Sequence, residues 1–523
     1  MRKTATFPRE TAITVLLLLL LGAAMMLTNR WISFMDDEIA ILQDATAPIH
    51  VTVMAFVDGN GLHRHPPLYD LILAAWMRLT AGRVALLRLP AIVSYLLGLW
   101  FVILSAGLVG RPQARRIALV LGMIFPYGFH FGRIAGWYSF SFFTLALVTY
   151  SYLRILEEPG WGRWALLVVA SILAVHANYF LLALLGLLAL DYCLAHRSQM
   201  RKALTATAGT MSVVLLGCYP LFRSLFVRLA VDAEILRPVF STKATALFGV
   251  YNLYTLFVSE SVAPWFWFLS IPAALSIAVC CSLLLRYGPR EARLLFLGFM
   301  ACMLAMTLLN LINTKRLLFL SPWLLIAVAA MLANLPNLSQ RKWAAGTLVV
   351  IGAIGWFGIV SRQFYAAPRL IEPWPSVAAE AAGEVREGGV VIGNNPSFFF
   401  YLTDLLRSAD GHPQFEGVFP VCLRHPQLFE PNQWLAEGKQ LGRTTLLVEG
   451  AADDTLWAST VEAQRFLDQT CRLDGVRREM LDSGFVWKQR LYPARRQPQW
   501  RIEVRTYACG EKNETAAQLH HGS

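Results

Sequence analysis

Charged residues are scarce in this chain of 523 residues. Only 15% of its residues are Asp, Glu, Lys or Arg, whereas soluble domains carry about 25%. The apolar fraction is 56%, above the ~45–50% of soluble domains. Internal repeats and low-complexity tracts are also lacking. This composition argues against an average soluble enzyme, a disordered chain, a coiled coil and a disulfide-rich mini-domain.

The scarcity of charge is confined to one part of the chain. Residues 1–360 contain 42 charged residues (12%), and residues 361–523 contain 38 (23%). We therefore expect a transmembrane domain over 1–360 and a water-soluble domain over 361–523. The formal net charge of +12 consists of +14 on the first part and −2 on the second. Basic loops of a membrane domain usually follow the positive-inside rule, so this charge does not indicate nucleic acid binding.

Apolar segments of about 20 residues predict the transmembrane helices. The first follows Arg2, Lys3 and Arg9 and has no evident cleavage site, so we expect an uncleaved helix with its N-terminus in the cytoplasm. About eleven spans are expected, at 11–29, 88–109, 116–132, 137–156, 164–177, 179–195, 203–227, 264–285, 294–312, 316–334 and 343–360. A shorter run at 66–80 is expected to be re-entrant or interfacial.

Basic residues support this topology. Every short loop assigned to the cytoplasm is basic, as the positive-inside rule requires. These residues are Arg111, Arg115 and Arg116; Arg154 and Arg163; Arg197, Arg201 and Lys202; Arg286, Arg290 and Arg293; and Arg341 and Lys342. An odd number of spans places the outer loop 30–87 and the C-terminal domain outside the cytoplasm. If the two short helices within 164–195 form a single span, the predicted orientation of every later segment in the membrane is reversed.

The C-terminal domain is expected to be α/β. The segment 389–393 predicts a strand, followed by a helix start at 397–402. Further strands are expected at 445–448, 485–491 and 500–507. Three of the eight cysteines lie in this domain, namely Cys422, Cys471 and Cys509. One disulfide is possible among them, and all three pairings are open.

Three consecutive acids, Asp36, Asp37 and Glu38, follow the first predicted span. An isolated acid at this place would simply mark the helix end. The same outer loop also carries Asp58, His63, Arg64, His65 and the pair Pro66-Pro67. A long, partly apolar loop with acids and histidines is costly to hold at a membrane surface, which favours a functional site.

Basic residues also occur on the outer side. Arg133 lies between two predicted spans, close to Tyr138, and is either an interfacial anchor or a bidentate phosphate ligand. Lys315 and Arg316 open the tenth span against the positive-inside bias, which favours contact with an anion. His176 lies at an outer turn, where a helix break is the simpler interpretation. Together these clusters predict an extracytoplasmic site in which acids act as general base or metal ligands and cations hold a phosphate.

The order of these motifs resembles the GT-C polyprenyl-phosphate-sugar glycosyltransferases. Within them, the protein O-mannosyltransferase-like group, which includes the lipid A aminoarabinose transferases, is the most similar. The matching motifs are Asp37-Glu38, His65-Pro66-Pro67-Leu68-Tyr69, Arg88-Leu89-Pro90, Arg133 with Trp137-Tyr138-Ser139, His176-Ala177-Asn178-Tyr179-Phe180, and Lys315-Arg316-Leu317-Leu318 before Ser321-Pro322. They span residues 1–335 in order, and their order and spacing are more specific than any one of them.

The resemblance implies a polytopic α-helical membrane protein with the GT-C fold, about eleven transmembrane helices and a periplasmic α/β domain. It implies an inverting glycosyltransferase of the cell envelope, in a bacterial inner membrane. Such an enzyme moves a sugar from a polyprenyl-phosphate carrier to a lipid, glycan or protein acceptor outside the cytoplasm.

The resemblance also implies roles for residues. Asp37 is the expected base, Glu38 orients the acceptor or the sugar, and Asp36 is an additional acid that leaves the match one residue open. The expected ligands of the lipid phosphate are Arg133, His65, Lys315 and Arg316, and further substrate-site candidates are Arg64, Tyr69, Tyr138 and His176. A divalent metal ion on Asp36, Asp37 and Glu38 is left open, since no fixed ligand spacing is visible.

Two other classes of function compete with this hypothesis. A transporter or flippase of a lipid-linked glycan should place its polar groups near the bilayer midplane, often in repeated halves. This chain has them at one interface and shows no repeat. A receptor that only binds a glycan would leave the acidic loop without a role.

Overall fold

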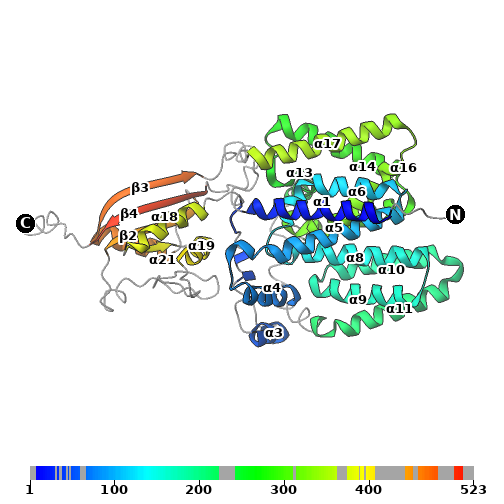
Figure 1. The fold of residues 1–523 in the computed structure, drawn as a ribbon, viewed down its shortest axis with the longest axis horizontal. Helices are drawn as coiled ribbons and strands as arrows, with labels where there is room; N and C mark the ends of the chain where they lie inside the picture. Colours follow the sequence, from blue (N-terminus) through cyan, green and yellow to red (C-terminus); the bar gives the residue numbers. More distant parts are fainter. Residues whose placement is uncertain are drawn as a thin grey trace, which may run out of the picture. The chain divides into compact units, whose positions relative to one another are not determined.

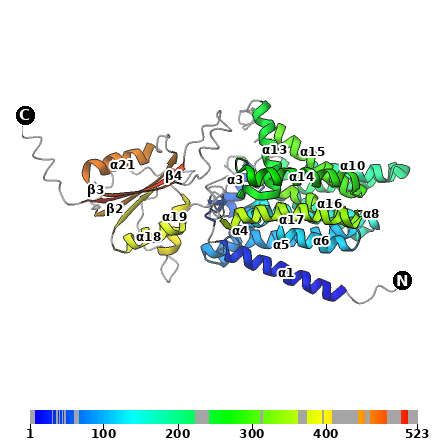
Figure 2. The same ribbon diagram turned by 90° about the horizontal axis from the view of Figure 1, so that it is seen from above.

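The computed structural model divides the chain into two compact units (Figures 1 and 2). Unit 1 comprises Met1–Thr28, Ile41–Thr80 and Ala85–Arg362, and unit 2 comprises Asn29–Ala40, Ala81–Val84 and Gln363–Ser523. The structure describes residues 7–29, 32–34, 38–39, 41–42, 45, 49–58, 66–222, 242–309, 314–361, 374–387, 389–393, 396–406, 442–451, 458–480 and 500–509. Two short pieces of the outer loop 30–87 thus group with the C-terminal part.

Unit 1 is helical throughout its described residues (Figure 1). Its α-helices are α1 (Phe7–Leu27), α3 (Ile49–Asp58), α4 (Leu68–Leu79), α5 (Leu89–Val109), α6 (Gln113–Ile124), α7 (Pro126–Phe131), α8 (Trp137–Glu157), α9 (Trp161–Ala177), α10 (Leu181–Ala195), α11 (Met200–Gly217), α13 (Thr242–Val258), α14 (Trp267–Tyr287), α15 (Arg290–Leu308), α16 (Ser321–Asn334) and α17 (Leu338–Ser361). Short 3-10 turns are η2 (Val84–Leu86), η3 (Arg197–Gln199), η4 (Ser259–Ser261) and η5 (Thr314–Leu320).

Among the described residues, seven helical segments are long and apolar enough to cross a membrane. They are Glu10–Leu27, Val84–Val109, Trp137–Glu157, Trp267–Tyr287, Arg290–Leu308, Thr314–Asn334 and Leu338–Ser361. The pair α10 and α11, bent by 85°, makes an eighth if it is one span. The protein is therefore an integral membrane protein, but with seven or eight candidate spans in place of the eleven predicted.

The lower count has local causes in the predicted short spans. The segment 116–132 is broken, because α6 has only 12 residues and α7 begins at Pro126. The proline restricts Phe125 to an extended conformation, with ψ of 99°, and ends α6. Helix α9 has only 17 residues. Helix α4, with 12 residues, is too short to span, as expected for the run 66–80.

The spans differ in how much of their surface the protein covers. Buried residues make up 94% of the apolar window of Thr314–Asn334 and 78% of that of Trp137–Glu157, but only 22% of that of Glu10–Leu27. Leu16, Leu19 and Leu20 of α1 are exposed. An apolar surface of this kind needs lipid rather than water around it. Helices α16 and α8 thus form the interior of unit 1, and α1 lies at its margin.

Side-chain bonds link the basic loops with neighbouring helix ends. Arg116, at the start of α6, pairs with Glu10 at the start of α1. Gln113 Nε2 donates to the Ala333 carbonyl near the end of α16 at 2.8 Å. Arg290, at the start of α15, pairs with the buried Asp191 of α10 at 2.6 Å. The Arg116–Glu10 pair is solvent-exposed and adds little stability. The bonds of Arg116 and Gln113 connect the ends of α1, α6 and α16, and the bond of Arg290 connects α10 with α15.

Unit 2 contains a four-stranded mixed sheet. Its strands are β1 (Val390–Gly393), β2 (Arg443–Ala451), β3 (Arg472–Met480) and β4 (Trp500–Ala508), in the order β1-β2-β4-β3. β1 pairs parallel to β2, and the other two pairings are antiparallel. Three helices accompany the sheet, α18 (Trp374–Arg386), α19 (Pro396–Leu406) and α21 (Ala458–Thr470). The sequence predicted β1, β2, β4 and α19 and missed β3, and the predicted strand 485–491 lies outside the described residues.

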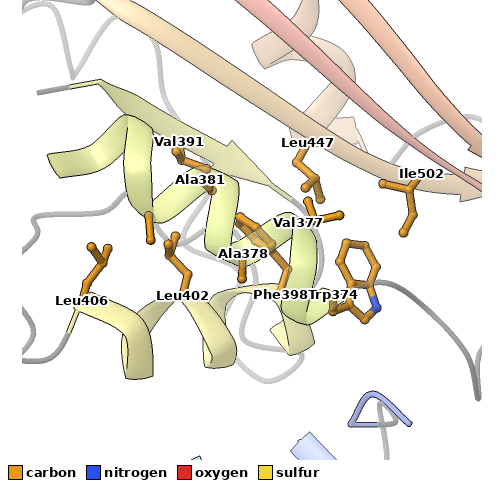
Figure 3. Packing of buried hydrophobic residues seen from close by; sticks show 11 residues of the cluster. Trp374, Val377, Ala378, Ala381, Val391, Phe398, Leu402, Leu406, Leu447 and Ile502 are labelled. Atoms are coloured by element: carbon orange, nitrogen blue, oxygen red, sulfur yellow. The ribbon is translucent and has the colours of Figure 1, made fainter. Parts of the chain in front are cut away.

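Both faces of the sheet carry apolar side chains, because successive residues of a strand point to opposite sides. On one face, Val391, Leu447 and Ile502 pack with side chains of α18 and α19 (Figure 3). On the other face, Ile392, Leu446 and Tyr507 pack with Leu467 of α21. The sheet is therefore covered by helices on both sides.

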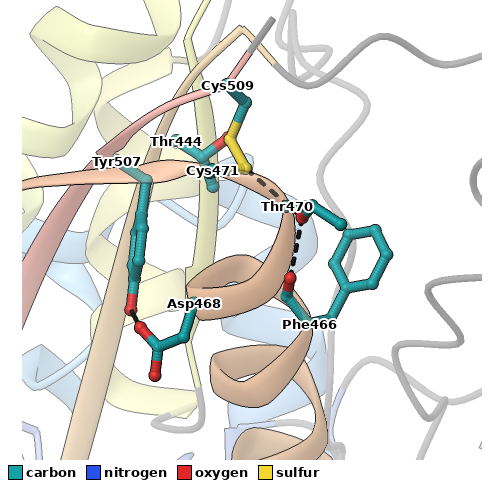
Figure 4. Close-up of a disulfide and its surroundings, with 7 residues drawn as sticks. All are labelled: Thr444, Phe466, Asp468, Thr470, Cys471, Tyr507 and Cys509. Atoms are coloured by element: carbon teal, nitrogen blue, oxygen red, sulfur yellow. Dashed lines mark hydrogen bonds between the residues drawn. A yellow bond between two sulfur atoms is a disulfide. The ribbon is translucent and has the colours of Figure 1, made fainter. Parts of the chain in front are cut away.

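A disulfide joins Cys471 and Cys509, at one end of α21 and of β4 (Figure 4). The structure thus selects one of the three pairings left open by the sequence, and Cys422 lies outside the described residues. Nearby, the Tyr507 hydroxyl donates to Asp468 Oδ1 at 2.7 Å. Burial raises the pKa of Tyr507 to about 12, so this hydroxyl stays protonated at neutral pH.

We expect peptide mapping without reductant to recover Cys471 linked to Cys509, and Cys422 to react with an alkylating agent. The double variant C471S/C509S should lower the free energy of unfolding of unit 2 by about 4 kcal/mol, because the crosslink restricts the unfolded chain. Limited proteolysis of the detergent-solubilised protein measures this loss. C422S serves as the control and should have no effect, and a disulfide that contains Cys422 would contradict the pairing.

Candidate functional site

The candidate site in unit 1 is built around α7 and the turn that follows it. All six residues of α7, Pro126–Phe131, are buried. The helix ends at Gly132, so that Arg133 lies on the turn between α7 and α8. Because the chain reverses here inside the helical unit, a charged side chain reaches the interior without interrupting a spanning helix.

Tyr95 of α5 determines which residues α7 can carry. Its aromatic ring lies against Gly128 and Gly132, where an added Cβ would collide with it. Tyr95 also packs against Phe142 of α8, with ring centroids 5.0 Å apart. The two glycines therefore allow α7 to approach α5 closely, and this contact fixes where along α5 the turn between α7 and α8 begins.

Arg133 is 1% exposed. Its Nη1 donates to Thr28 Oγ1 at 2.6 Å, and its guanidinium lies over the Phe129 ring at 4.9 Å. The Thr28 hydroxyl in turn donates to the Ala24 carbonyl at 2.7 Å, which orients its lone pairs toward Arg133. An interfacial anchor keeps its charge among lipid headgroups, so this burial does not fit that interpretation, and binding of phosphate by Arg133 stays a prediction.

His130 of α7 is bonded to Ser259 of η4. His130 Nδ1 and Ser259 Oγ are 2.8 Å apart, and both residues are buried. Ser259 has a φ of 62°, a conformation that costs about 1–3 kcal/mol for a residue other than glycine. His130 was not among the predicted site residues; its place three residues before Arg133 is the signal that could have marked it.

The turn η5 approaches the same region with Lys315 and Arg316. The Tyr127 hydroxyl of α7 donates to the Thr314 carbonyl, and Thr314 Oγ1 donates to Asn252 Oδ1 of α13 at 3.1 Å. Lys315 is buried and Arg316 is partly exposed. η5 also packs against α8. Arg133 and Lys315 thus come from elements in direct contact, although 182 residues separate them in the sequence.

Helix α4 and the start of α5 add further buried polar groups. Tyr69 is 1% exposed and packs against Phe140 of α8, with ring centroids 6.2 Å apart. Asp70 is also buried. Arg88, at the N-terminal end of α5, is 2% exposed and was quoted above as a motif residue but not predicted to bind substrate.

Tyr138 and His176 have different surroundings. Tyr138 is buried, with its ring centroid 4.5 Å from that of Trp137, so the pair does not form an exposed aromatic belt. His176 is partly exposed, and its Nε2 lies 3.2 Å from the Gly217 carbonyl of α11. Asn178 Oδ1 accepts from the Phe180 amide at 3.0 Å, a local bond that shapes the break between α9 and α10. His176 therefore matches the simpler interpretation, a polar group at a helix break.

The remaining predicted residues divide as follows. Asp36, Asp37, Arg64 and His65 lie outside the described residues. Glu38 belongs to unit 2, where it is fully buried. Within the described part of the chain, no three His, Cys, Asp or Glu side chains are grouped so that they could hold a metal ion. A metal on Asp36, Asp37 and Glu38 stays a prediction.

No protein-family model and no curated protein matches this chain. Two crystal structures of ArnT from Cupriavidus metallidurans match this chain, one in the apo state and one bound to undecaprenyl phosphate. They are 12% and 13% identical, each with a TM-score of 0.54 over 96% of this chain and 98% of that chain. This chain has an ArnT-like fold. The resemblance stated from the motifs is thus confirmed at the level of the fold.

An oligosaccharyltransferase from Archaeoglobus fulgidus, in complex with Zn and sulfate, is also similar in part. Its TM-score is 0.46, at 11% identity over 91% of this chain and 80% of that chain. This weaker likeness carries no part of the argument.

The packing of α7 on Tyr95 can be tested by a single methyl group. Gly128→Ala should destabilise the protein by about 1–3 kcal/mol, because the new Cβ collides with the buried Tyr95 hydroxyl. Gly186→Ala in α10 is the matched control, since no atom lies within 4 Å of its added Cβ. Thermal unfolding in detergent should show a lower Tm for the first variant only. Equal Tm values would contradict the close approach of α7 and α5.

Proposed function

We propose that this protein is an inverting glycosyltransferase that moves a sugar from a polyprenyl-phosphate carrier to a hydroxyl or phosphate acceptor outside the cytoplasm. The observation that carries the proposal is the buried Arg133 on the α7–α8 turn, in a chain whose fold matches an ArnT that binds undecaprenyl phosphate. A buried guanidinium requires compensation by an anion or by hydrogen bonds, and it binds phosphate oxygens in bidentate fashion.

In the proposed reaction, an acceptor oxygen attacks C1 of the sugar from the face opposite the lipid phosphate. The Asp37 carboxylate takes the proton of an attacking hydroxyl, and Glu38 orients the acceptor or the sugar. The bond between C1 and the phosphate oxygen breaks, and polyprenyl phosphate leaves. Because negative charge grows on that leaving oxygen, nearby cations lower the barrier.

The proposed cations are Arg133, Lys315, Arg316 and His65. Lys315 lies on η5, which contacts α7 and α8. Arg316 Nε is buried and has no hydrogen-bond partner among the described residues, which is consistent with a guanidinium that meets a ligand. Tyr69, Tyr138 and Arg64 are proposed to contact the sugar or the acceptor, while the surroundings of His176 do not add support for such a role.

The proposed orientation follows the basic loops. The N-terminus is cytoplasmic and the C-terminal part, residues 361–523, is periplasmic, in a bacterial inner membrane. Basic loops that are tied to neighbouring helix ends, such as the one that begins α6 with Arg116 and the one that begins α15 with Arg290, are consistent with this arrangement. The Cys471–Cys509 disulfide is also consistent, because disulfides persist in oxidising compartments such as the periplasm.

Asp37→Asn tests the proposed base. Transfer from a polyprenyl-phosphate sugar to acceptor should fall about 10²- to 10⁴-fold, because the amide cannot accept the proton. Binding of polyprenyl phosphate, measured by scintillation proximity with a radiolabelled lipid, should be unchanged. Asp36→Asn is the matched control and should retain most of the transfer. If both variants keep full transfer, the base has been misassigned, and lipid-linked sugar that crosses the membrane without reaching an acceptor would identify a flippase.

Arg133→Gln tests the proposed phosphate ligand. The variant keeps a side chain that can hydrogen-bond to Thr28 but loses the charge, so affinity for polyprenyl phosphate should fall about tenfold or more. Arg116→Gln removes an equal charge from an exposed surface pair and should leave the affinity unchanged. An Arg133→Gln variant that binds the lipid normally would show that Arg133 has a structural role only.

A further inference from the structure

The segment that carries Glu38 belongs to unit 2, together with the sheet formed by the end of the chain. Its described apolar residues are almost fully covered: Ile32 is 3% exposed, Phe34 is 2% exposed and Ile39 is 0% exposed. Glu38 itself is 0% exposed. The described side chains of this segment are therefore buried against other parts of the protein.

Helix α19 is one of these parts. The Phe34 amide donates to the Tyr401 hydroxyl at 3.1 Å. The Phe34 ring also packs against the rings of Phe400 and Tyr401, with centroids 5.8 Å and 5.5 Å away. Phe34 thus contributes both a directional bond and an aromatic cluster to one helix turn.

Helix α19 contacts both the core of unit 2 and Phe34, and Tyr401 packs against both. Phe398, Leu402 and Leu406, spaced four residues apart, lie in the apolar core between α19, α18 and the sheet (Figure 3). Phe400 and Tyr401 lie between these positions on the helix and meet Phe34. The helix therefore joins the core of the sheet to the segment that carries Glu38.

The other end of the outer loop reaches the same helix. Ala81 and Gly82 have φ of 50° and 65°, which makes a tight turn after α4. The Val84 amide then lies 3.5 Å from Asp404 Oδ1, one helical turn beyond Tyr401. This contact is long and weak, but it shows that α19 meets the chain at Phe34 and again at Val84, the first residue of η2.

We propose that Tyr401 is a positioning residue for the acidic segment, acting through Phe34. The inference rests on the proposed function, in which Glu38 and its neighbours Asp36 and Asp37 face the sugar and the acceptor. In the sequence, these acids follow Phe34 within four residues. A base must be held within hydrogen-bond reach of its proton, and small displacements reduce the rate more than they reduce binding.

Tyr401→Phe separates positioning from packing. It keeps the ring against Phe34 and removes only the hydroxyl that accepts from the Phe34 amide. Amide hydrogen exchange at Phe34, resolved by fragmentation mass spectrometry on the full chain, should become about fivefold faster. The kcat for sugar transfer should fall about fivefold or more, while KM for the donor and binding of radiolabelled polyprenyl phosphate stay unchanged.

Tyr507→Phe is the matched control. It removes a tyrosine hydroxyl from the same unit, where it bonds to Asp468 and not to Phe34. It should leave both Phe34 exchange and kcat at the values of the unaltered protein. Equal effects of the two variants would mean that any loosening of unit 2 slows the reaction, which would overturn a specific role for Tyr401.

The hydrogen-exchange measurement at Phe34 does not depend on whether the protein transfers sugar. If Phe34 exchange is unchanged in Tyr401→Phe, the positioning contact is refuted, whatever the activity. If exchange rises but kcat stays the same, the contact exists and does not position the base, which also overturns the proposal. If the unaltered protein transfers no sugar from any polyprenyl-phosphate donor, the proposed function fails and the positioning role fails with it, while faster Phe34 exchange would still establish the contact alone.

Discussion

A charge buried among apolar helices is the constraint on which the interior of unit 1 depends. Arg133 is enclosed as completely as the aromatic residues around it, and its guanidinium must find compensation within the protein or from a ligand. Thr28 and Phe129 provide part of this compensation. The contacts of Arg133 with these two residues depend on where α7 ends. The position of Arg133 within unit 1 therefore follows from the break at Pro126 and from Gly128 and Gly132, against which Tyr95 packs.

The same constraint explains the polar residues of the central helices. Thr149 and Ser151 of α8 donate to carbonyls four residues earlier in their own helix. Thr149 also accepts from Trp323 Nε1 of α16 at 2.8 Å. The hydroxyls of Thr149 and Ser151 are therefore satisfied inside an enclosed span, by carbonyls of the same helix. The buried Arg133 differs from these groups because a local carbonyl cannot balance its charge.

The sequence was sufficient where one local pattern determined the structure. Long apolar windows located the seven spans, short apolar runs located β1 and β2, and alternating apolar residues located β4. It overestimated the number of spans, because a helix break at Pro126 and the 85° bend after α10 are visible only in three dimensions. β3 was missed because its sequence, RLDGVRREM, is largely charged and gives no apolar alternation. The choice among three disulfide pairings required the tertiary fold.

The candidate site was predictable to a similar degree. Arg133, Tyr138 and Lys315 were predicted from their place between spans, and the structure buries all three in neighbouring elements. Whether they bind substrate stays a prediction. His130 was missed because a lone histidine in an apolar run is usually a core residue, and only its bond to Ser259 singles it out. The association of Phe34 with Tyr401 links residues 367 positions apart, which no local pattern reveals.

Unit 2 is assembled from three separate stretches of the chain, Asn29–Ala40, Ala81–Val84 and Gln363–Ser523. The ribosome makes the acidic stretch among the first residues, and α19 begins 358 residues after Glu38. During synthesis, the early stretch therefore lacks its packing partners from the C-terminal part while the helices of unit 1 are inserted. Maturation therefore ends with the C-terminal part, and a chain truncated before α19 would contain the acids but never the helix that receives Phe34.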